Sequence, residues 1–526
     1  MNSGDNIGLL PRLDPPRSET LAVSGSFSSV AARLCLTFAA GLAVIRAAVH
    51  VHRYWISDLG IDHPAGVMIA MALDLTHGVF YRPLFGPVGY GGTRYFPLYF
   101  VLHALLVKLG VPILLGAYLL SGLSVLLLIG GVFCLLVRIG VGRWLSAAVA
   151  GTVLASVSAQ SAIIGPHPDG FASALNIWAL TIIAGGTLNA RRITVAAMLL
   201  TLAWSAKLTM CFGLVLAVVW LVSKGLRREA LRLAVETILG YLIVVVLMVV
   251  FSSGRVIEIF RKCALGGANW KRVLEGPLFM VWNAFYKDLN VLLLVFLAVT
   301  ALGAELLESP VKSLKQLPVL LLIAALATTA AIFGSPGTNV NQLLDLQAAA
   351  IIFLGSLCVR PSPVQRQIGI YALVCATLIP IGLGTLGAFL HPGAPADATA
   401  QKTAGHLNEV VEVVRRVDGP VLAENPAITV LAGRSPYVLD PWMFSLLRKR
   451  IPGFEQPLLQ ELRLRSFGAV VLIEDPETEY GRQWYDRQHF GPGFRETLAE
   501  NYQLLAVIAG QRIYVPKPAA TSLTER

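Results

Sequence analysis

Long apolar runs, separated by short polar segments, recur along the chain from about residue 30 to residue 390. A helix that crosses a bilayer needs about 20 apolar residues. The runs predict about eleven spans, at 30–51, 113–137, 145–164, 171–188, 195–205, 210–222, 235–251, 289–306, 319–333, 343–357 and 368–390. The pattern therefore predicts a mostly α-helical, polytopic membrane protein.

The pattern changes at both ends of this region. Residues 1–29 are polar and rich in Pro, Ser and Gly, which is typical of a disordered tail. From residue 391 charged residues return, and we predict a small α/β domain over 391–526. Apolar runs of strand length lie within 421–433, 467–475 and 502–516, and helical spacing covers 407–417 and 458–464. The transmembrane domain is thus expected to cover 30–390.

The loop between the first two spans, residues 52–112, is large and polar. Its two apolar pieces, 64–75 and 96–109, are too short to span a bilayer and predict helices at the membrane surface. Only 14% of the chain is charged, yet this loop concentrates ionisable residues: Asp58, Asp62, His63, Asp74, His77, Arg82 and Arg94. We therefore expect the chemistry of the protein to lie here.

Composition supports the membrane prediction and sets the topology. The 526 residues are 55% hydrophobic, with a net charge of +11 and a mean hydropathy of +0.67. The basic residues cluster between apolar runs, where the positive-inside rule places them, so the charge does not indicate nucleic-acid binding. The rule predicts a cytoplasmic N-terminus, so the loop after the first span is expected outside. Because the number of spans is odd, the C-terminal domain is expected outside as well.

Cysteine spacing indicates neither a zinc site nor a disulfide framework. Five of the six cysteines lie in apolar segments, where packing is their expected role. No cofactor or metal site is predicted, and dependence on a divalent metal is left open.

Asp62 and Asp58 are the candidate catalytic carboxylates. Transfer of a group from a phosphate to a hydroxyl needs a base to deprotonate that hydroxyl, and polar or cationic groups to hold the leaving phosphate. Asp62 precedes His63-Pro64 at the start of a predicted helix, so its alternative role is that of a helix cap. Asp58 lies four residues earlier.

Several other polar residues lie on the predicted outer side, within loops or at the ends of spans. Arg82 and Arg94 flank a Gly-rich segment and suit either phosphate contacts or lipid headgroups. His167 and Asp169 lie in a short loop, where Asp169 could instead cap a helix. Lys207 could extend to the interface or pair with a phosphate.

Two further outer segments carry candidates. The predicted loop 252–288 departs from the positive-inside rule, which favours anion binding by Arg261, Lys262, Lys271 and Arg272. At 339–345, Asn341 and Asp345 could contact sugar hydroxyls or cap a helix.

At these residues the chain resembles the bacterial family 39-like and aminoarabinose-transferase-like glycosyltransferases of the GT-C class. Those proteins have an acidic residue soon after the first span, an amphipathic helix, a "PLYY"-like segment and "KLFG"; Asp62, 97–100 and 108–110 correspond here. The segment HPDGFASAL at 167–175 resembles the family's R-x-D-x-L-A loop without its Arg. GTNVNQLLD at 337–345 resembles its G-S-N-Y-N-Y-L-L-E segment, and 433–444 and 467–475 resemble its outer domain.

The resemblance implies a GT-C-like bundle of about eleven spans with a large first outer loop. It also implies a polyprenyl-phosphate-linked sugar donor, an extracytoplasmic acceptor, and inverting transfer with Asp62 as the base, in a bacterial inner membrane. Many relatives have Glu after the Asp, whereas this chain has His63, which weakens the case for paired carboxylates or a metal. The alternative is a transporter or lipid flippase, and a third interpretation is a non-catalytic lipid-binding scaffold. Against a carrier, the spans are nearly free of charge in their middles.

Overall fold

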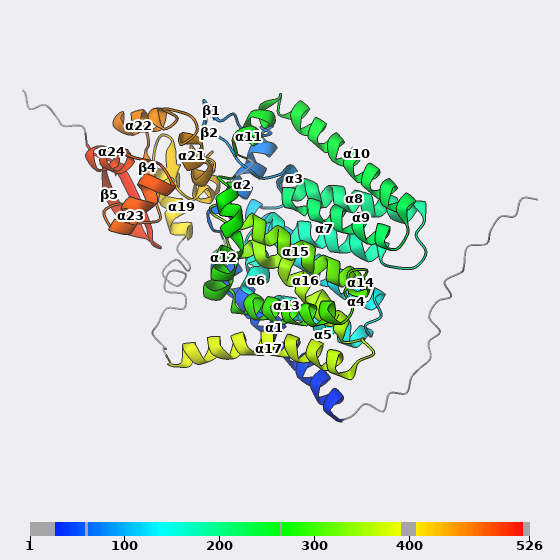
Figure 1. Cartoon of the computed structure of the whole chain (residues 1–526). Helices are drawn as coiled ribbons and strands as arrows, with labels where there is room; N and C mark the ends of the chain where they lie inside the picture. The colour runs from blue at the N-terminus through cyan, green and yellow to red at the C-terminus, as the bar shows by residue number, and fades with distance from the viewer. Residues whose placement is uncertain (1–26, 58–60, 264–265, 391–406, 519–526) are drawn as a thin grey trace, which may run out of the picture.

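The structure is a computed structural model that describes residues 27–57, 61–263, 266–390 and 407–518. A large helical domain carries a smaller domain, coloured yellow to red in Figure 1, at one end. Asp58 and most of the predicted N-terminal tail lie outside the described residues.

A helix corresponds to each predicted span. These helices are α1 (Phe27–Ser57), α4 (Ile113–Arg138), α5 (Arg143–Gly151) with α6 (Val157–Ile164), α7 (Pro168–Ile183), α8 (Ala190–Ala206), α9 (Cys211–Ser223), α10 (Arg227–Phe251), α13 (Leu289–Glu308), α15 (Leu317–Ile332), α16 (Leu344–Leu357) and α17 (Pro363–Leu390). Among the described residues, six helices are long and apolar enough to cross a membrane, and a bent pair would make a seventh. The other predicted spans correspond to the shorter helices α7, α8, α9 and α15.

The third predicted span is not a single straight helix. It bends by 77° between Ala155 and Val157. Ser156 caps α6 and donates to Gln347 Oε1 at 2.6 Å. Asp288, 1% exposed, accepts from the backbone N–H and the hydroxyl of Ser158 at 2.8 and 2.6 Å. A break inside a membrane is tolerated when neighbouring helices satisfy the freed polar groups, as these side chains do.

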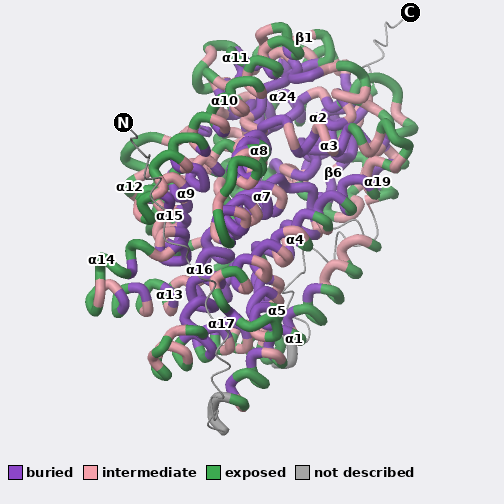
Figure 2. Tube along the Cα trace, turned by 90° about the vertical axis from the view of Figure 1, so that its right-hand side faces the viewer, coloured by how far each residue is buried: buried purple, intermediate pink, exposed green. Residues whose placement is uncertain are grey.

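The helical domain presents an apolar surface to its surroundings. Figure 2 shows that α16 is buried in the centre, whereas α10 is largely exposed. α10 exposes large apolar side chains, among them Leu239, Ile243 and Val246. A helix with an apolar exposed face suits a hydrocarbon environment better than water.

Short helices connect the spans on the side of the smaller domain. The first outer loop forms α2 (His63–Thr76), the small hairpin of β1 (Phe85–Gly86) and β2 (Gly89–Tyr90), and α3 (Pro97–Lys108). Both predicted helices are therefore present, and most of α2 is buried within the protein. The segment predicted as a loop over 252–288 instead forms α11 (Arg255–Cys263) and α12 (Trp270–Lys287). One-turn elements complete the domain: η1 (Thr152–Ala155), η2 (Leu208–Met210), α14 (Pro310–Ser313) and η3 (Val340–Leu343).

The C-terminal domain has the expected α/β character. Its sheet has the order β3-β4-β6-β5, with β3 parallel to β4 and the other pairs antiparallel. Its strands are β3 (Val421–Ala423), β4 (Ala469–Leu472), β5 (Tyr502–Ile508) and β6 (Gln511–Pro516). Its helices are α19 (Leu407–Arg416), α20 (Pro426–Leu431), α21 (Pro441–Arg448), α22 (Gln456–Arg463), α23 (Glu479–Gln483), η4 (Trp484–Gln488) and α24 (Phe494–Asn501).

The predicted strand over 421–433 is wrong in its second half. Asn425 accepts from the backbone N–H of Ala427 at 3.0 Å, and Pro426 occupies the first helical position. An Asn cap followed by Pro starts a helix, and this outweighs the β-branched residues that follow.

The C-terminal domain shares a hydrophobic core with the first outer loop. Tyr90 is fully buried, its backbone N–H donates to Tyr437 O at 2.7 Å, and its carbonyl accepts from Leu439 at 3.0 Å. Asn425 Nδ2 donates to Ile61 O at 2.8 Å. A Cβ at Gly66 would lie 2.3 Å from Asn425 Oδ1, so a glycine is needed where α2 meets α20. These contacts hold the helix that begins after Asp62 in one place.

Candidate functional site

Asp62 stands at the start of α2 with an accessible carboxylate. Its Oδ1 accepts from the backbone N–H of Ala65 at 2.9 Å, so the predicted capping role is present. The side chain is still 54% exposed, and Oδ1 lies 3.7 Å from His167 Nε2. The capping role weighed from the sequence is therefore present, and the carboxylate stays open on one side.

A buried triad lies beside this carboxylate. Lys207 Nζ is 2.7 Å from Asp169 Oδ1 and 3.6 Å from Asp345 Oδ2. The three side chains are 11%, 3% and 8% exposed. The contact at 2.7 Å is an ion pair without hydrogen-bond alignment. Buried charges of this kind need partners, because removing an ion from water costs several kcal/mol.

Four separate segments build the triad and its surroundings. Asp169 lies in the first turn of α7, two residues after His167, and Lys207 follows α8 directly. Asn341 Nδ2 donates to Asp169 Oδ2 at 3.0 Å. The structure thus brings together six predicted site residues that are far apart in sequence: Asp62, His167, Asp169, Lys207, Asn341 and Asp345.

Ser173 was not among the predicted site residues, and Lys287 was predicted only as part of the basic cluster in 252–288. Ser173 Oγ donates to Asp345 Oδ1, and it lies four residues after Asp169 on the same helix face. That spacing was visible in the sequence. Lys287 Nζ donates to Asn339 Oδ1 at 2.8 Å, a contact between segments that no local pattern indicates.

A second polar cluster supports α2 from the C-terminal domain. Glu424 is fully buried, and His489 Nδ1 lies 2.8 Å from its Oε1. Burial opposes ionisation of Glu424, but His489 and hydrogen bonds from Ile473 and Trp484 hold its pKa below the usual value.

His63 links this cluster to Asp62. Its ring lies 6.0 Å from that of His489, and its Nε2 is 3.7 Å from Asp440 Oδ1. Burial lowers the pKa of His63, with Asp440 acting in the opposite direction. The residue after Asp62 is therefore a contact with the C-terminal domain.

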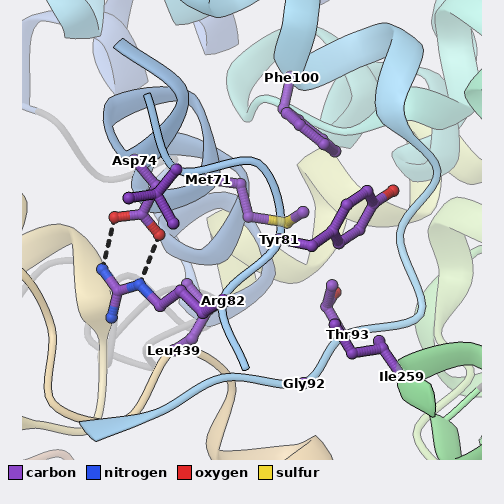
Figure 3. Close-up of a pocket in the computed structure, with 10 residues that line it drawn as sticks. Met71, Asp74, Tyr81, Arg82, Gly92, Thr93, Phe100, Ile259 and Leu439 are labelled. Carbon is purple, nitrogen blue, oxygen red and sulfur yellow. Dashed lines mark hydrogen bonds and ion pairs between the residues drawn. The ribbon is translucent and has the colours of Figure 1, made fainter. Parts of the chain in front are cut away.

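Arg82 lies within the protein and is only 5% exposed. Its Nε and Nη2 donate to the two oxygens of Asp74 at 2.6 Å, and Nη1 donates to Pro436 O at 2.6 Å. Figure 3 shows this pair among the residues that line a small cavity. The cavity volume is about 10 Å³, which leaves room for about one water. The predicted phosphate contact would require breaking the pair, so the geometry gives Arg82 a structural role between α2 and the C-terminal domain.

Arg94 and the basic residues of 252–288 are spread over a wider surface. Arg94 is half-buried, and its Nη1 donates to Ser335 Oγ at 3.2 Å. Arg261 and Lys271 are exposed, and the carbonyl of Lys262 accepts from Arg450. Within the described ranges, no hydrogen bond or ion pair links this basic cluster to Asp62. Arg272 lines a separate cavity.

The arrangement places one accessible carboxylate, that of Asp62, beside the buried ion pairs of Lys207 with Asp169 and Asp345. An aspartate in this position can accept a proton from a bound hydroxyl. Tyr95 lies within electrostatic range of Asp62 and Asp169, and burial together with Asp440 raises its pKa, so its phenol stays protonated and can donate a hydrogen bond. In the part of the chain that the structure describes, no group of three or more His, Cys, Asp or Glu is arranged to hold a metal ion.

Comparisons with known proteins identify the fold. No protein-family model matches the sequence, and no curated protein matches it. Solved structures of similar fold include the following two proteins. One is the archaeal oligosaccharyltransferase AglB from Archaeoglobus fulgidus, in complex with an inhibitory peptide and a dolichol-phosphate (12% identity, TM-score 0.54, 95% of this chain and 76% of that chain). The other is ArnT from Cupriavidus metallidurans bound to undecaprenyl phosphate (13% identity, TM-score 0.52, 91% of this chain and 98% of that chain). The chain therefore has the polytopic GT-C fold, as the resemblance led us to expect.

Proposed function

We propose that the chain is an integral-membrane glycosyltransferase that moves a sugar from a polyprenyl-phosphate donor to an extracytoplasmic acceptor, with Asp62 as the general base. The observation that carries the proposal is the contrast between the carboxylates. Asp169 and Asp345 are buried and share Lys207, whereas Asp62 is 54% exposed beside them. Only Asp62 among the three is free to meet a substrate.

The reaction balances with these groups. The acceptor oxygen attacks the anomeric carbon of the donor sugar, and Asp62 takes the hydroxyl proton. The bond between that carbon and the phosphate oxygen breaks, and its electron pair leaves with the phosphate. A single displacement inverts the anomeric configuration. His167, 3.7 Å from Asp62, positions the carboxylate.

The leaving phosphate needs positive charge where it develops. Arg94 is one candidate cation, and its neighbour Tyr95 lies within electrostatic range of Asp62 and Asp169. Its only described hydrogen bond goes to the neutral hydroxyl of Ser335, so its charge is available. Lys207 supplies a second positive charge, which Asp169 and Asp345 partly neutralise.

Lipid-phosphate carriers bound to proteins of the same fold support the donor class. AglB was solved with a dolichol-phosphate and ArnT with undecaprenyl phosphate. We propose that the protein lies in a bacterial inner membrane with its N-terminus in the cytoplasm. The basic loop after α9 and the first outer loop lie at opposite ends of spans, and the positive-inside rule places the basic loop in the cytoplasm.

The test is a transfer assay with the purified full chain in lipid nanodiscs and a polyprenyl-phosphate sugar labelled in the sugar. Release of free polyprenyl phosphate together with labelled sugar on water or acceptor supports the proposal. A protein that moves the labelled lipid between leaflets without breaking the sugar–phosphate bond would instead be a flippase, and the proposal would fail.

A further inference from the structure

A second cavity lies between the helical domain and the C-terminal domain. Its volume is about 460 Å³, within the range of about 300–1,000 Å³ that is usual for small-molecule sites. Helix α12, the segment 333–338, helix α21 and the end of η4 line it. Figure 1 shows α12 and α21 along the border between the two domains.

The lining of this cavity is cationic. Arg272, Lys449 and Arg487 all line it, and no Asp or Glu does. No salt bridge joins any of the three to a carboxylate in the described parts of the chain. The carboxylate next to Arg487, that of Asp486, is bound to Arg495 at 2.8 Å. The cavity therefore holds positive charge that the protein itself does not neutralise.

The pKa of Lys449 agrees with this picture. Burial lowers it, and the charges of Arg448 and Arg272 lower it further. Cations gathered without an acidic partner repel one another, so an anion that enters the cavity would relieve this repulsion.

The other lining groups suit a sugar ring. The indole of Trp442 borders the cavity, and its buried Nε1–H has no hydrogen-bond partner among the described residues. The side-chain amides of Asn283 and Gln488 line the same space. An aromatic face with amides around it can cover the apolar side of a sugar ring and bond its hydroxyls.

The cavity is connected to the candidate site by one short segment. Gly337 has φ of +77°, and a Cβ there would lie 2.8 Å from the Trp442 ring, so the glycine lets the segment approach the indole. Four residues later in the same segment, Asn341 donates to Asp169. A ligand held against 335–338 therefore touches the segment that supports the triad.

We propose that this cavity binds a saccharide that carries a phosphate or carboxylate. This inference rests on the proposed function. If the saccharide in the cavity is the acceptor, the acceptor is a negatively charged glycan held by residues of both domains. The three cations hold the acidic group, and Trp442 with the two amides holds the ring. Free glycan and the glycan head of a lipid share this chemistry.

The experiment uses the full chain in phosphatidylcholine nanodiscs and saturation-transfer NMR. The probes are glucose 6-phosphate, glucose and inorganic phosphate. We expect transfer to the ring protons of glucose 6-phosphate and at least tenfold weaker binding of glucose. The double variant Lys449→Glu/Arg487→Glu should weaken glucose 6-phosphate at least tenfold. The matched control Arg463→Glu, an exposed charge reversal outside the cavity, should leave it unchanged.

Trp442→Leu separates a saccharide site from a bare anion site. It should weaken glucose 6-phosphate and leave competition by inorganic phosphate unchanged. Equal binding of glucose 6-phosphate by wild type and the double variant would overturn the assignment. If Trp442→Leu does not change the binding of glucose 6-phosphate, the cavity does not recognise a saccharide and binds a bare anion, such as a lipid headgroup phosphate. In that case, anionic phosphatidylglycerol in the nanodisc would compete with the probe.

Binding is measured without turnover, so this inference and the proposed function fail separately. A protein that binds the probe in this cavity yet breaks no donor bond would contradict the proposed function alone. A protein that transfers sugar but binds the probe equally well in the double variant would contradict this inference alone.

Discussion

Lys207 Nζ lies 2.7 Å from Asp169 Oδ1, although Asp169 belongs to α7 and Lys207 to the break between α8 and η2. The same nitrogen is 3.6 Å from Asp345, so a single cation serves two buried carboxylates. Lys207 had two predicted roles, extension to the interface or pairing with a phosphate. In the structure, Lys207 instead pairs with two carboxylates of the protein itself. Asp169 and Asp345 are therefore buried and paired, whereas Asp62 is exposed.

The first prediction concerns this triad. Lys207→Met should lower the free energy of unfolding by about 3–5 kcal/mol, because it leaves buried carboxylates without a partner. Thermal and denaturant unfolding of the protein in detergent measure it. The triple variant with Asp169→Asn and Asp345→Asn removes the charges together and should recover most of the loss. A stable Lys207→Met protein that has lost only donor binding would instead favour the phosphate role.

The second prediction concerns Asp62. Asp62→Asn retains a capping oxygen, because Asn caps a helix about as well as Asp. It removes the proton acceptor, which typically contributes about 10²–10⁴-fold in rate. We therefore expect turnover to fall by that factor with an unchanged melting temperature, measured by release of polyprenyl phosphate. Asp62→Ala should in addition cost about 1 kcal/mol of stability. Full activity in the Asn variant would exclude the base role and leave Asp58 to test.

The third prediction concerns Arg82 and Asp74. Arg82→Met leaves Asp74 buried and unpaired, and we expect a loss of about 3–5 kcal/mol together with faster proteolysis of the C-terminal domain. Arg82→Met combined with Asp74→Leu should restore resistance to protease. Should Arg82→Met keep its stability and lose donor affinity, the phosphate contact predicted from sequence would be correct.

The fourth prediction is a pH dependence. The pKa of His63 is lowered in the folded protein, so the unfolded state binds its proton more readily. Its contribution to stability is complete above about pH 6.5 and is lost as the pH falls through the lower, folded value. The lowered pKa of Glu424 acts in the same direction at more acidic pH, below about 4.3. Melting temperatures should therefore decrease from pH 7 to pH 5, and less steeply in His63→Gln. Identical slopes for both proteins would exclude His63.

The fifth prediction is topological. Lys224, after α9, and Arg463, at the end of α22, should lie on opposite sides of the membrane. Single cysteines at these positions, in a background from which the six native cysteines have been removed, would be labelled from opposite sides of sealed vesicles. Labelling of both from the same side would contradict the proposed orientation.

The apolar runs by themselves determined the helical membrane domain, because burial in hydrocarbon imposes a length and composition that are visible locally. The change at residue 391 likewise predicted the α/β domain, and Asp62 was visible as a carboxylate at a helix start. The bend after Ala155 was not predictable, since the acid that stabilises it, Asp288, comes from the distant junction between α12 and α13. The start of helix α20 was visible in the sequence as Asn425 followed by Pro426. We nevertheless predicted a strand there, because β-branched residues follow.

What tertiary structure decided was the partner of each charge. A sequence shows that Arg82, Lys207 and Arg272 are cations on the predicted outer side, and their charge alone suits a phosphate equally well. In the fold, Arg82 meets Asp74 and Lys207 meets Asp169, whereas Arg272 faces a cavity without an acidic lining residue. Electrostatic partners are chosen by distances of a few ångströms between segments that can be more than a hundred residues apart, and no periodicity along the chain encodes those distances.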